Sequence, residues 1–300
     1  MSLLSISQLS KDEITALFER TQQIQEGHYD HEVARRKILI PLFLEPSTRT
    51  RLSFETAMLR LGGQVLPTPN KEGLAISKDE SLEDTIRVIS SFADILVIRH
   101  PDERAVYTAD EYASVPVING GNGCDEHPTQ ALLDLYSIQQ EKGRLEGLNI
   151  ALAGDLRYAR TMHSLIKGLT LYKNTLFLIS PKALRAPKAL RRMLEERKVS
   201  YVESTCLEEV IWELDVVYLV MLQHHRIKDP AEVKQLRSCY YRLTPEVLKS
   251  GKKDVTILHP LVRNNEIAVE VDTLPNAAYF RQTRNGVFVR MALLEKILST

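Results

Sequence analysis

The chain carries no net charge, because its 39 lysines and arginines are balanced by 39 aspartates and glutamates. This absence removes any electrostatic argument for binding nucleic acid or an anionic membrane. No apolar run approaches the roughly 18 residues of a transmembrane helix, and the first ten residues lack the pattern of a signal peptide. We therefore expect neither nucleic acid nor a membrane among the partners of this protein.

Cysteine is also scarce. Cys124, Cys206 and Cys239 are odd in number, scattered and without the spacing of a metal site. Free thiols of this kind are typical of a reducing compartment, so the sequence predicts a cytoplasmic protein. The run Cys-Asp-Glu-His at 124–127 is contiguous and lacks chelating geometry, and we expect no metal there.

A glycine-rich dinucleotide loop is missing as well. The nearest candidates are the Gly-Gly-Asn-Gly run at 120–123 and the Gly-Asp pair at 154–155. Neither has the G-x-G-x-x-G spacing that lets a backbone approach a pyrophosphate. We therefore expect no nucleotide cofactor.

What the sequence does contain is a series of short apolar runs that alternate with helical patterns. Continuous runs rich in β-branched residues, separated by helices, indicate parallel sheets covered on both faces. The predicted strands are 38–44, 95–99, 115–118, 149–153, 175–179, 201–203, 216–220 and 255–258. The predicted helices are 11–24, 50–61, 82–92, 129–140 and 286–298.

Two series of strands predict two domains. The predicted fold class is α/β, with two doubly wound parallel-sheet domains, and we expect the active site between them. The helical stretch 129–140 followed by Lys142-Gly143 is interpreted as the connection, and the last helix as a return to the first domain. The predicted domains are therefore 1–142 with 286–300, and 143–285.

Polar clusters follow several of these strands, where parallel α/β sheets bind their ligands. The most informative is the run Ser-Thr-Arg-Thr-Arg at 47–51, directly after one strand and at the start of a helix. A helix N-terminus has unpaired N–H groups and a partial positive charge. Hydroxyls and guanidiniums added there predict a site for a small anion such as a phosphate.

Four motifs in order resemble the aspartate/ornithine transcarbamoylase family, and most of all its aspartate branch. The motifs are 47–51, Arg99-His100-Pro101, His127-Pro128-Thr129-Gln130 and His259-Pro260-Leu261. The resemblance runs nearly end to end. It implies an enzyme that moves the carbamoyl group of carbamoyl phosphate to the amine of L-aspartate, giving N-carbamoyl-L-aspartate and phosphate in pyrimidine biosynthesis.

The resemblance also implies roles for individual residues. The first domain would bind carbamoyl phosphate and the second the amino acid. Negative charge that builds on the carbonyl oxygen is stabilised by hydrogen-bond donors held in position. The resemblance implies four catalytic residues: Arg49, Thr50, Arg99 and His127. The residues implied to bind carbamoyl phosphate are Ser47, Thr48, Arg49, Thr50, Arg99, His127, Gln130, Pro260 and Leu261.

The acceptor half would comprise Lys78, Arg160, Gln223 and Met221. By resemblance, Arg160 binds the α-carboxylate of the acceptor, and Lys78 reaches into the active site of a neighbouring subunit. The resemblance therefore implies a homotrimer with shared active sites. Whether a separate regulatory chain binds is left open by the sequence.

Three departures from the family pattern concern the acceptor. Met221 stands where the family has an arginine for the aspartate side chain, and Val262 replaces a proline whose peptide bond is cis. The Leu261–Val262 bond is therefore expected to be either a costly cis bond or a trans bond with a displaced Leu261 carbonyl. In the loop 74–80, Leu74 occupies a serine position and Asp79 a glycine position, which removes the glycine's freedom to adopt a positive φ.

Two alternatives follow from these departures. One is a carbamoyltransferase for a different amine. The other is a weakly active homologue that serves as a binding or assembly subunit. The complete set of predicted oxyanion donors argues against the second alternative.

Overall fold

The computed structural model describes residues 1–68, 75–238 and 240–299. The chain folds into two compact units, Met1–Leu133 with Thr283–Thr300 and Asp134–Gln282. The first division lies inside a helix rather than at its end. The boundaries expected from the sequence, at 142 and 286, lie nine and three residues further along the chain, because a helix terminus is the only boundary that the pattern displays.

Nine strands and ten α-helices are found in the described residues. The strands are β1 Ile38–Phe43, β2 Gln64–Val65, β3 Ile95–His100, β4 Val117–Asn122, β5 Asn149–Ala153, β6 Thr175–Ile179, β7 Ser200–Ser204, β8 Val216–Leu219 and β9 Thr256–Leu258. The helices are α1 Lys11–Gln25, α2 Thr48–Arg60, α3 Leu82–Ser90, α4 Ala105–Tyr112, α5 Pro128–Lys142, α6 Arg160–Leu169, α7 Lys188–Glu196, α8 Pro230–Ser238, α9 Pro245–Lys249 and α10 Tyr279–Leu298.

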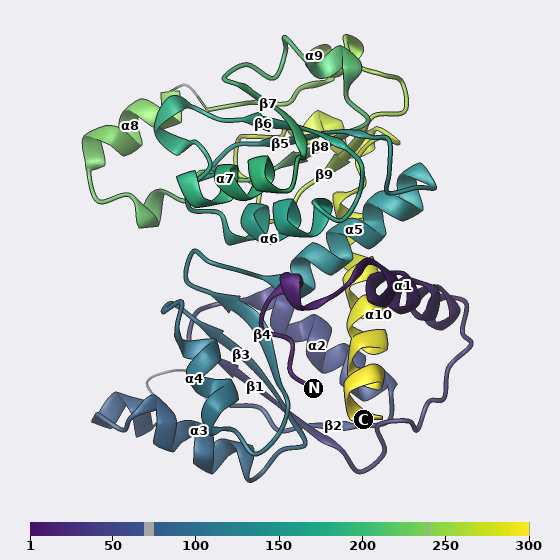
Figure 1. The fold of residues 1–300 in the computed structure, drawn as a ribbon, viewed down its shortest axis with the longest axis vertical. Coiled ribbons are helices and arrows are strands. Elements are labelled where there is room, and N and C mark those ends of the chain that lie inside the picture. Colours follow the sequence, from purple (N-terminus) through teal and green to yellow (C-terminus); the bar gives the residue numbers. More distant parts are fainter. Residues whose placement is uncertain (69–74, 239, 300) are drawn as a thin grey trace. The chain divides into compact units, whose positions relative to one another are not determined.

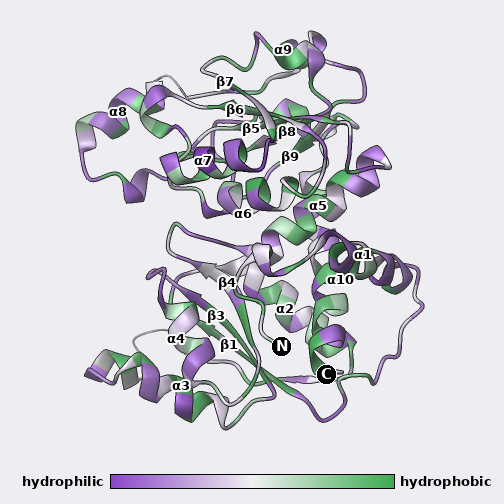
Figure 2. Cartoon of the chain, viewed as in Figure 1, coloured by the Kyte–Doolittle hydropathy of each residue, from purple (hydrophilic) through white to green (hydrophobic). Residues whose placement is uncertain are grey.

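The sheet of the first unit has the strand order β2-β1-β3-β4, and all its pairs are parallel. Its strands β1 and β3 are predominantly hydrophobic along their length (Figure 2). Buried side chains on both faces explain why these strands read as continuous apolar runs. Ile40, Leu42, Leu96 and Ile98 belong to one buried cluster of this unit.

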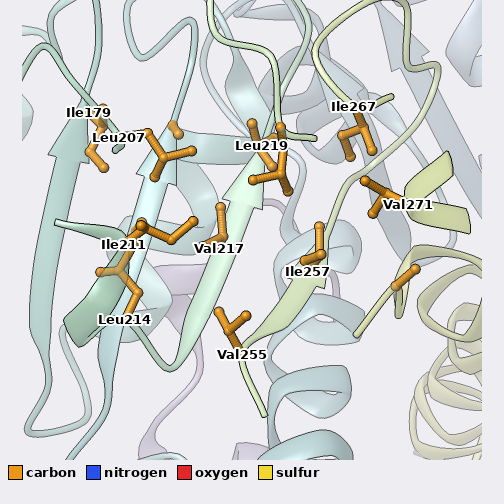
Figure 3. Close-up of a cluster of buried hydrophobic side chains, with 14 of the residues drawn as sticks. Ile179, Leu207, Ile211, Leu214, Val217, Leu219, Val255, Ile257, Ile267 and Val271 are labelled. Atoms are coloured by element: carbon orange, nitrogen blue, oxygen red, sulfur yellow. The ribbon is translucent and has the colours of Figure 1, made fainter. Parts of the chain in front are cut away.

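The sheet of the second unit has the order β7-β6-β5-β8-β9, again all parallel. Its core lies between the sheet and the segments that cover one face, and Figure 3 shows part of this cluster. Val217, Leu219 and Ile257 come from the strands, and Leu207 and Ile211 from the segment before β8. Burial of this apolar surface stabilises the unit at roughly 25 cal/mol per Å².

Each strand order reverses direction once. In the first unit the reversal lies between β1 and β3, and in the second between β5 and β8 (Figure 1). Helices leave opposite faces of the sheet on the two sides of such a point, and a crevice opens at the carboxyl ends of the strands. The two reversals therefore mark where each unit is expected to bind ligands.

The prediction of two parallel α/β sheets is confirmed. Two predicted elements differ from the structure by more than two residues at one end. Gly120 and Gly121 lie inside β4, not after it, because the strand continues past its apolar part into a buried run. Helix α10 begins at Tyr279, well before the predicted start at 286, since the buried positions of its first turns include the polar residues Gln282 and Asn285.

No helix in the described part of the chain is both long and apolar enough to cross a membrane.

Candidate active site

The N-terminus of α2 lies at the reversal point of the first unit. Ser47 is its N-cap residue and has an extended backbone, but its side chain makes no capping hydrogen bond. The first turn holds no acidic residue and contains Arg49 and Arg51 instead. Cations are unfavourable at the positive end of a helix dipole. This arrangement therefore favours a bound anion at the start of α2.

Two of the predicted oxyanion donors are brought together. Oγ1 of Thr50 and Nε2 of His127 lie 3.2 Å apart, and both side chains are buried. Thr50 is in the first turn of α2, while His127 directly precedes α5. The carbonyl of His127 accepts the backbone N–H of Gln130 and so begins the helix that carries this glutamine.

Arg99 is the penultimate residue of β3, beside the strand that leads to α2. Its Nε lies 3.2 Å from Oε2 of Glu45, and its Nη1 donates to the carbonyl of Gly120 at 3.3 Å. Backbone contact between Leu44 and Arg99 holds the two strand ends together. Glu45 thus orients the Arg99 guanidinium near the α2 N-terminus.

Arg49 remains accessible to solvent, yet the surrounding atoms desolvate its guanidinium and lower its pKa. An arginine stays protonated at neutral pH in spite of such a shift. Ser47, Thr48 and Arg49 thus form the accessible part of the predicted site, and Thr50 the buried part.

A buried arginine that the sequence analysis did not single out joins these helices. Nη2 of Arg290, on α10, donates to Oγ1 of Thr129 at 3.3 Å, and its guanidinium carbon lies 4.9 Å from the centre of the Phe54 ring. Arg290 is only 3% exposed. Its position as a lone cation within the apolar run 287–294 was the available signal.

At the reversal point of the second unit, the carboxylate of Asp155 organises the backbone. It accepts the N–H groups of Arg157 and Tyr158 at 3.1 and 2.9 Å, and that of Gln223 at 3.1 Å. Burial raises the pKa of Asp155, against the effect of these hydrogen bonds. Asp155 therefore ties the end of β5 to the segment after β8, where Gln223 lies.

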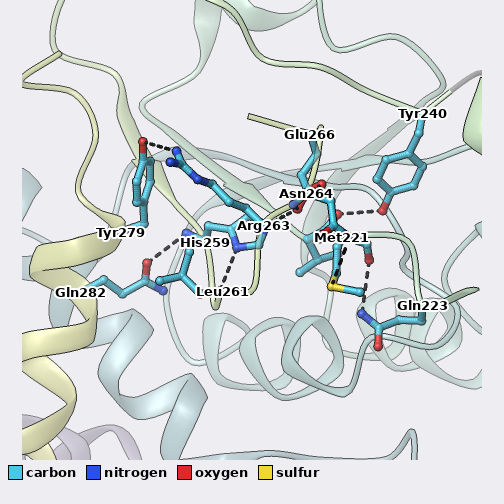
Figure 4. A network of polar contacts seen from close by, with 11 residues as sticks. Met221, Gln223, Tyr240, His259, Leu261, Arg263, Asn264, Glu266, Tyr279 and Gln282 are labelled. Carbon is cyan, nitrogen blue, oxygen red and sulfur yellow. Dashed lines mark hydrogen bonds and ion pairs between the residues drawn. The ribbon is translucent and has the colours of Figure 1, made fainter. Parts of the chain in front are cut away.

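Three of the predicted acceptor-half residues follow the ends of β5 and β8. Arg160 is the first residue of α6 and is buried. Nε2 of Gln223 donates to the carbonyl of Met221 at 3.3 Å, and Sδ of Met221 lies 3.9 Å from Nδ2 of Asn264 (Figure 4). Met221 is thus half-buried beside a neutral amide.

The segment after β9 carries Pro260 and Leu261, both partly exposed. The Leu261–Val262 peptide is cis, and Leu261 has a φ of 54°. Of the two conformations considered from the sequence, the structure therefore has the cis form. The side chain of His259 is buried beneath this segment and contacts Leu261 and Glu266.

Lys78 ends the short 3₁₀ helix Ala75–Lys78, and it is exposed. Asp79 has a φ of 66°. The aspartate therefore adopts the positive φ that the replacement of the family's glycine was expected to exclude. Aspartate is among the few residues that tolerate this left-handed region. The expectation for Leu74 lies outside the described residues.

Within residues 1–68, 75–238 and 240–299, no three His, Cys, Asp or Glu side chains gather as a metal site would require. Cys124 and Cys206 carry reduced thiols, and Cys239 lies outside the described residues.

Comparison with known families covers both units. Residues 1–140 match the family described as aspartate/ornithine carbamoyltransferase, carbamoyl-P binding domain. Residues 146–297 match aspartate/ornithine carbamoyltransferase, Asp/Orn binding domain.

Individual relatives share the whole length. The chain is 47% identical to the aspartate carbamoyltransferase catalytic subunit of Clostridium perfringens, with 99% of this chain and 97% of the relative covered. Among solved structures, aspartate transcarbamoylase from Trypanosoma cruzi in complex with carbamoyl phosphate and aspartate is 38% identical, with a TM-score of 0.93 and coverage of 99% and 96%. The catalytic subunit from M. jannaschii is 42% identical, with a TM-score of 0.90 and coverage of 99% and 98%.

Proposed function

We propose that this chain, which belongs to the aspartate/ornithine carbamoyltransferase family, transfers the carbamoyl group of carbamoyl phosphate to the amine of L-aspartate. The products are N-carbamoyl-L-aspartate and phosphate, and the reaction serves pyrimidine synthesis. The relatives described as aspartate carbamoyltransferases support the acceptor. The arrangement at the start of α2, with Thr50 3.2 Å from His127, is the observation that carries the chemistry.

The phosphate group binds at the N-terminus of α2 in this proposal. Backbone N–H groups and hydroxyls of Ser47, Thr48 and Thr50 donate to its oxygens, and Arg49 supplies charge. Arg99 leaves or shares its contact with Glu45 to reach the phosphate and the carbonyl oxygen. The ion pair holds the guanidinium ready, so little ordering cost remains when the ligand arrives.

The carbonyl oxygen becomes an oxyanion when the amine attacks. Thr50, Arg99 and His127 donate to it, and a preorganised donor of this kind typically contributes about 100-fold or more to the rate. Gln130 and the carbonyls of Pro260 and Leu261 hold the carbamoyl amide. The phosphate leaves from the site that bound it, and no covalent enzyme intermediate is required.

Arg160 binds the α-carboxylate of the acceptor, and Gln223 helps to orient it. Met221 and the neighbouring Asn264 present no positive charge to the acceptor side chain. This observation favours a second candidate function, carbamoyl transfer to an amine without a second carboxylate.

The reaction is tested by incubating the purified protein with carbamoyl phosphate and L-aspartate and identifying the ureido product by mass spectrometry. We expect N-carbamoyl-L-aspartate. Parallel reactions with asparagine, alanine and ornithine provide the comparison. A product from one of these amines, and none from aspartate, would replace the first candidate by the second.

We also propose a cytoplasmic homotrimer whose active sites receive Lys78 from a neighbouring subunit. Reduced thiols at Cys124 and Cys206 suit a reducing compartment. Lys78→Ala and Arg49→Ala variants are each expected to be inactive alone and to regain partial activity when their subunits are mixed, because some sites then have neither substitution. Mixing that restores nothing, with subunit exchange verified by mass, would show that Lys78 acts within its own subunit.

A further inference from the structure

A buried chain of hydrogen bonds leads to the segment that carries Pro260 and Leu261. The hydroxyl of Tyr218 donates a hydrogen bond to the carboxylate of Asp134 at 2.7 Å, and Nε2 of Gln282 donates one to the same carboxylate at 2.6 Å. Oε1 of Gln282 then accepts the backbone N–H of His259 at 2.9 Å. All four residues are at most 1% exposed, so water cannot replace these contacts.

The hydrogen bonds of His259 determine which ring nitrogen carries the proton. The backbone N–H of Leu261 lies 2.8 Å from Nδ1 and can only donate, so Nδ1 must accept. The proton is therefore on Nε2, which lies 2.9 Å from Oε1 of Glu266 and donates to it. Figure 4 shows the ring between its two partners.

Glu266 is equally constrained. Its carboxylate also accepts the backbone N–H of Asn264, at 3.0 and 3.1 Å from its two oxygens. The side chains of His259 and Glu266 are 0% and 3% exposed. Burial alone would raise the pKa of Glu266, but the hydrogen bond from His259 and that from Asn264 lower it.

We propose that His259 and Glu266 are positioning residues that aim the carbonyls of Pro260 and Leu261 at the amide of the carbamoyl group. The proposal rests on the proposed function. Both side chains are buried, so they act through the backbone and do not touch substrate. Leu261 has a left-handed φ of 54°, a conformation that is unfavourable for a non-glycine residue, and its N–H is the group that Nδ1 of His259 holds.

Two ligands separate this role from a general effect on the fold. Phosphonoacetamide has a phosphonate and an amide, whereas inorganic phosphate has no amide. Only the first can use the two carbonyls. The ratio of their dissociation constants, measured by calorimetry, therefore reports the positioning of the 260–261 segment, and it requires no turnover.

His259→Gln keeps a donor where Nε2 stood but has no acceptor for the N–H of Leu261. We expect phosphonoacetamide binding to weaken about tenfold, as for the loss of one hydrogen bond, with phosphate binding unchanged. His259→Asn keeps an acceptor near the position of Nδ1, so its binding of phosphonoacetamide should weaken less than that of His259→Gln. Glu266→Ala should resemble His259→Gln, and Glu266→Gln, which can still accept from the ring, should restore binding to within about threefold of wild type.

Asp272→Asn is the matched control. Asp272 pairs with Arg263, at the flank of the same segment, and with the hydroxyl of Tyr279. The ratio of the dissociation constants for phosphonoacetamide and phosphate should be the same in Asp272→Asn as in wild type. Thermal unfolding identifies any variant that is not folded, and the remaining variants still decide the question.

An unchanged ratio in folded His259→Gln or Glu266→Ala would overturn the proposal, as would an equal loss in Asp272→Asn. These outcomes leave the proposed function intact if the wild type makes N-carbamoyl-L-aspartate. A wild type that makes no ureido product, yet shows the expected ratios, would instead count against the proposed function alone.

Discussion

The two units build their binding residues in different ways. In the first unit, one contiguous run at the start of α2 supplies most of the polar groups, and the helix terminus orients them. In the second unit, the groups depend on contacts between distant parts of the chain. Asp155 and Gln223 are 68 residues apart, and Asp134 and Gln282 are 148 apart. A phosphate site can thus be encoded locally, whereas the acceptor site requires the assembled sheet.

Removal of Arg99 should give the largest effect and test the local site. We expect Arg99→Ala to lower kcat/KM by about 100-fold or more, because a preorganised donor to the oxyanion is lost. Steady-state kinetics with L-aspartate would measure it. Arg104→Ala removes an exposed arginine at the start of α4 and should change kcat/KM by less than threefold. A small effect of Arg99→Ala would mean that the guanidinium stays with Glu45 during turnover.

A new charge at Met221 tests the distributed site. We expect Met221→Arg to lower the KM for L-aspartate by about tenfold or more, since a charged hydrogen bond contributes roughly 1.5–3 kcal/mol. Met221→Leu keeps the apolar character and should leave the KM nearly unchanged. Equal KM values for Met221→Arg and wild type would show that another cation already holds the second carboxylate.

Gly154→Ala tests how tightly the residues at the reversal point of the second unit are packed. A Cβ there would lie 2.5 Å from the carbonyl oxygen of Val220 and 2.6 Å from the hydroxyl of Tyr240, at a φ of +122°. We expect the free energy of unfolding to fall by about 2–3 kcal/mol in urea titrations. Gly143→Ala also has a positive φ but meets nothing within 4 Å, so it should cost only about 1 kcal/mol. Equal costs would show that the backbone at 154 moves freely.

The smallest effect concerns pH. Hydrogen bonds from His259 and Asn264 lower the pKa of Glu266 below its usual value of 4.5. The unfolded chain then binds the proton more strongly, so the contribution of Glu266 to stability is present above about pH 4.5 and is lost as the pH falls through the folded-state pKa. Urea titrations between pH 7 and pH 3 should show a shallower loss of stability for Glu266→Gln than for wild type. Identical slopes would mean that Glu266 is not ionised in the folded protein.

The sequence predicted the strands well because parallel, doubly covered strands are continuous apolar runs. The prediction was poorer where the buried residues of an element are not apolar. The glycines of β4 are buried strand residues without apolar side chains, and the start of α10 at Tyr279 has too little apolar periodicity to be recognised. The two-residue strand β2 is too short to form a pattern.

The sequence by itself determined the α/β class, the family resemblance and the anion-binding character of residues 47–51, because these depend on local periodicity and on adjacent residues. Only the tertiary structure decided the tautomer of His259, the partners of Asp155 and the conformation of Leu261 and Asp79. The contact between Asp155 and Gln223 joins two strand ends that are 68 residues apart in the chain, so it exists only when the sheet has brought those ends to the same edge. The partners of His259 are close to it in sequence, but they meet the ring only when the segment after β9 has adopted its folded backbone.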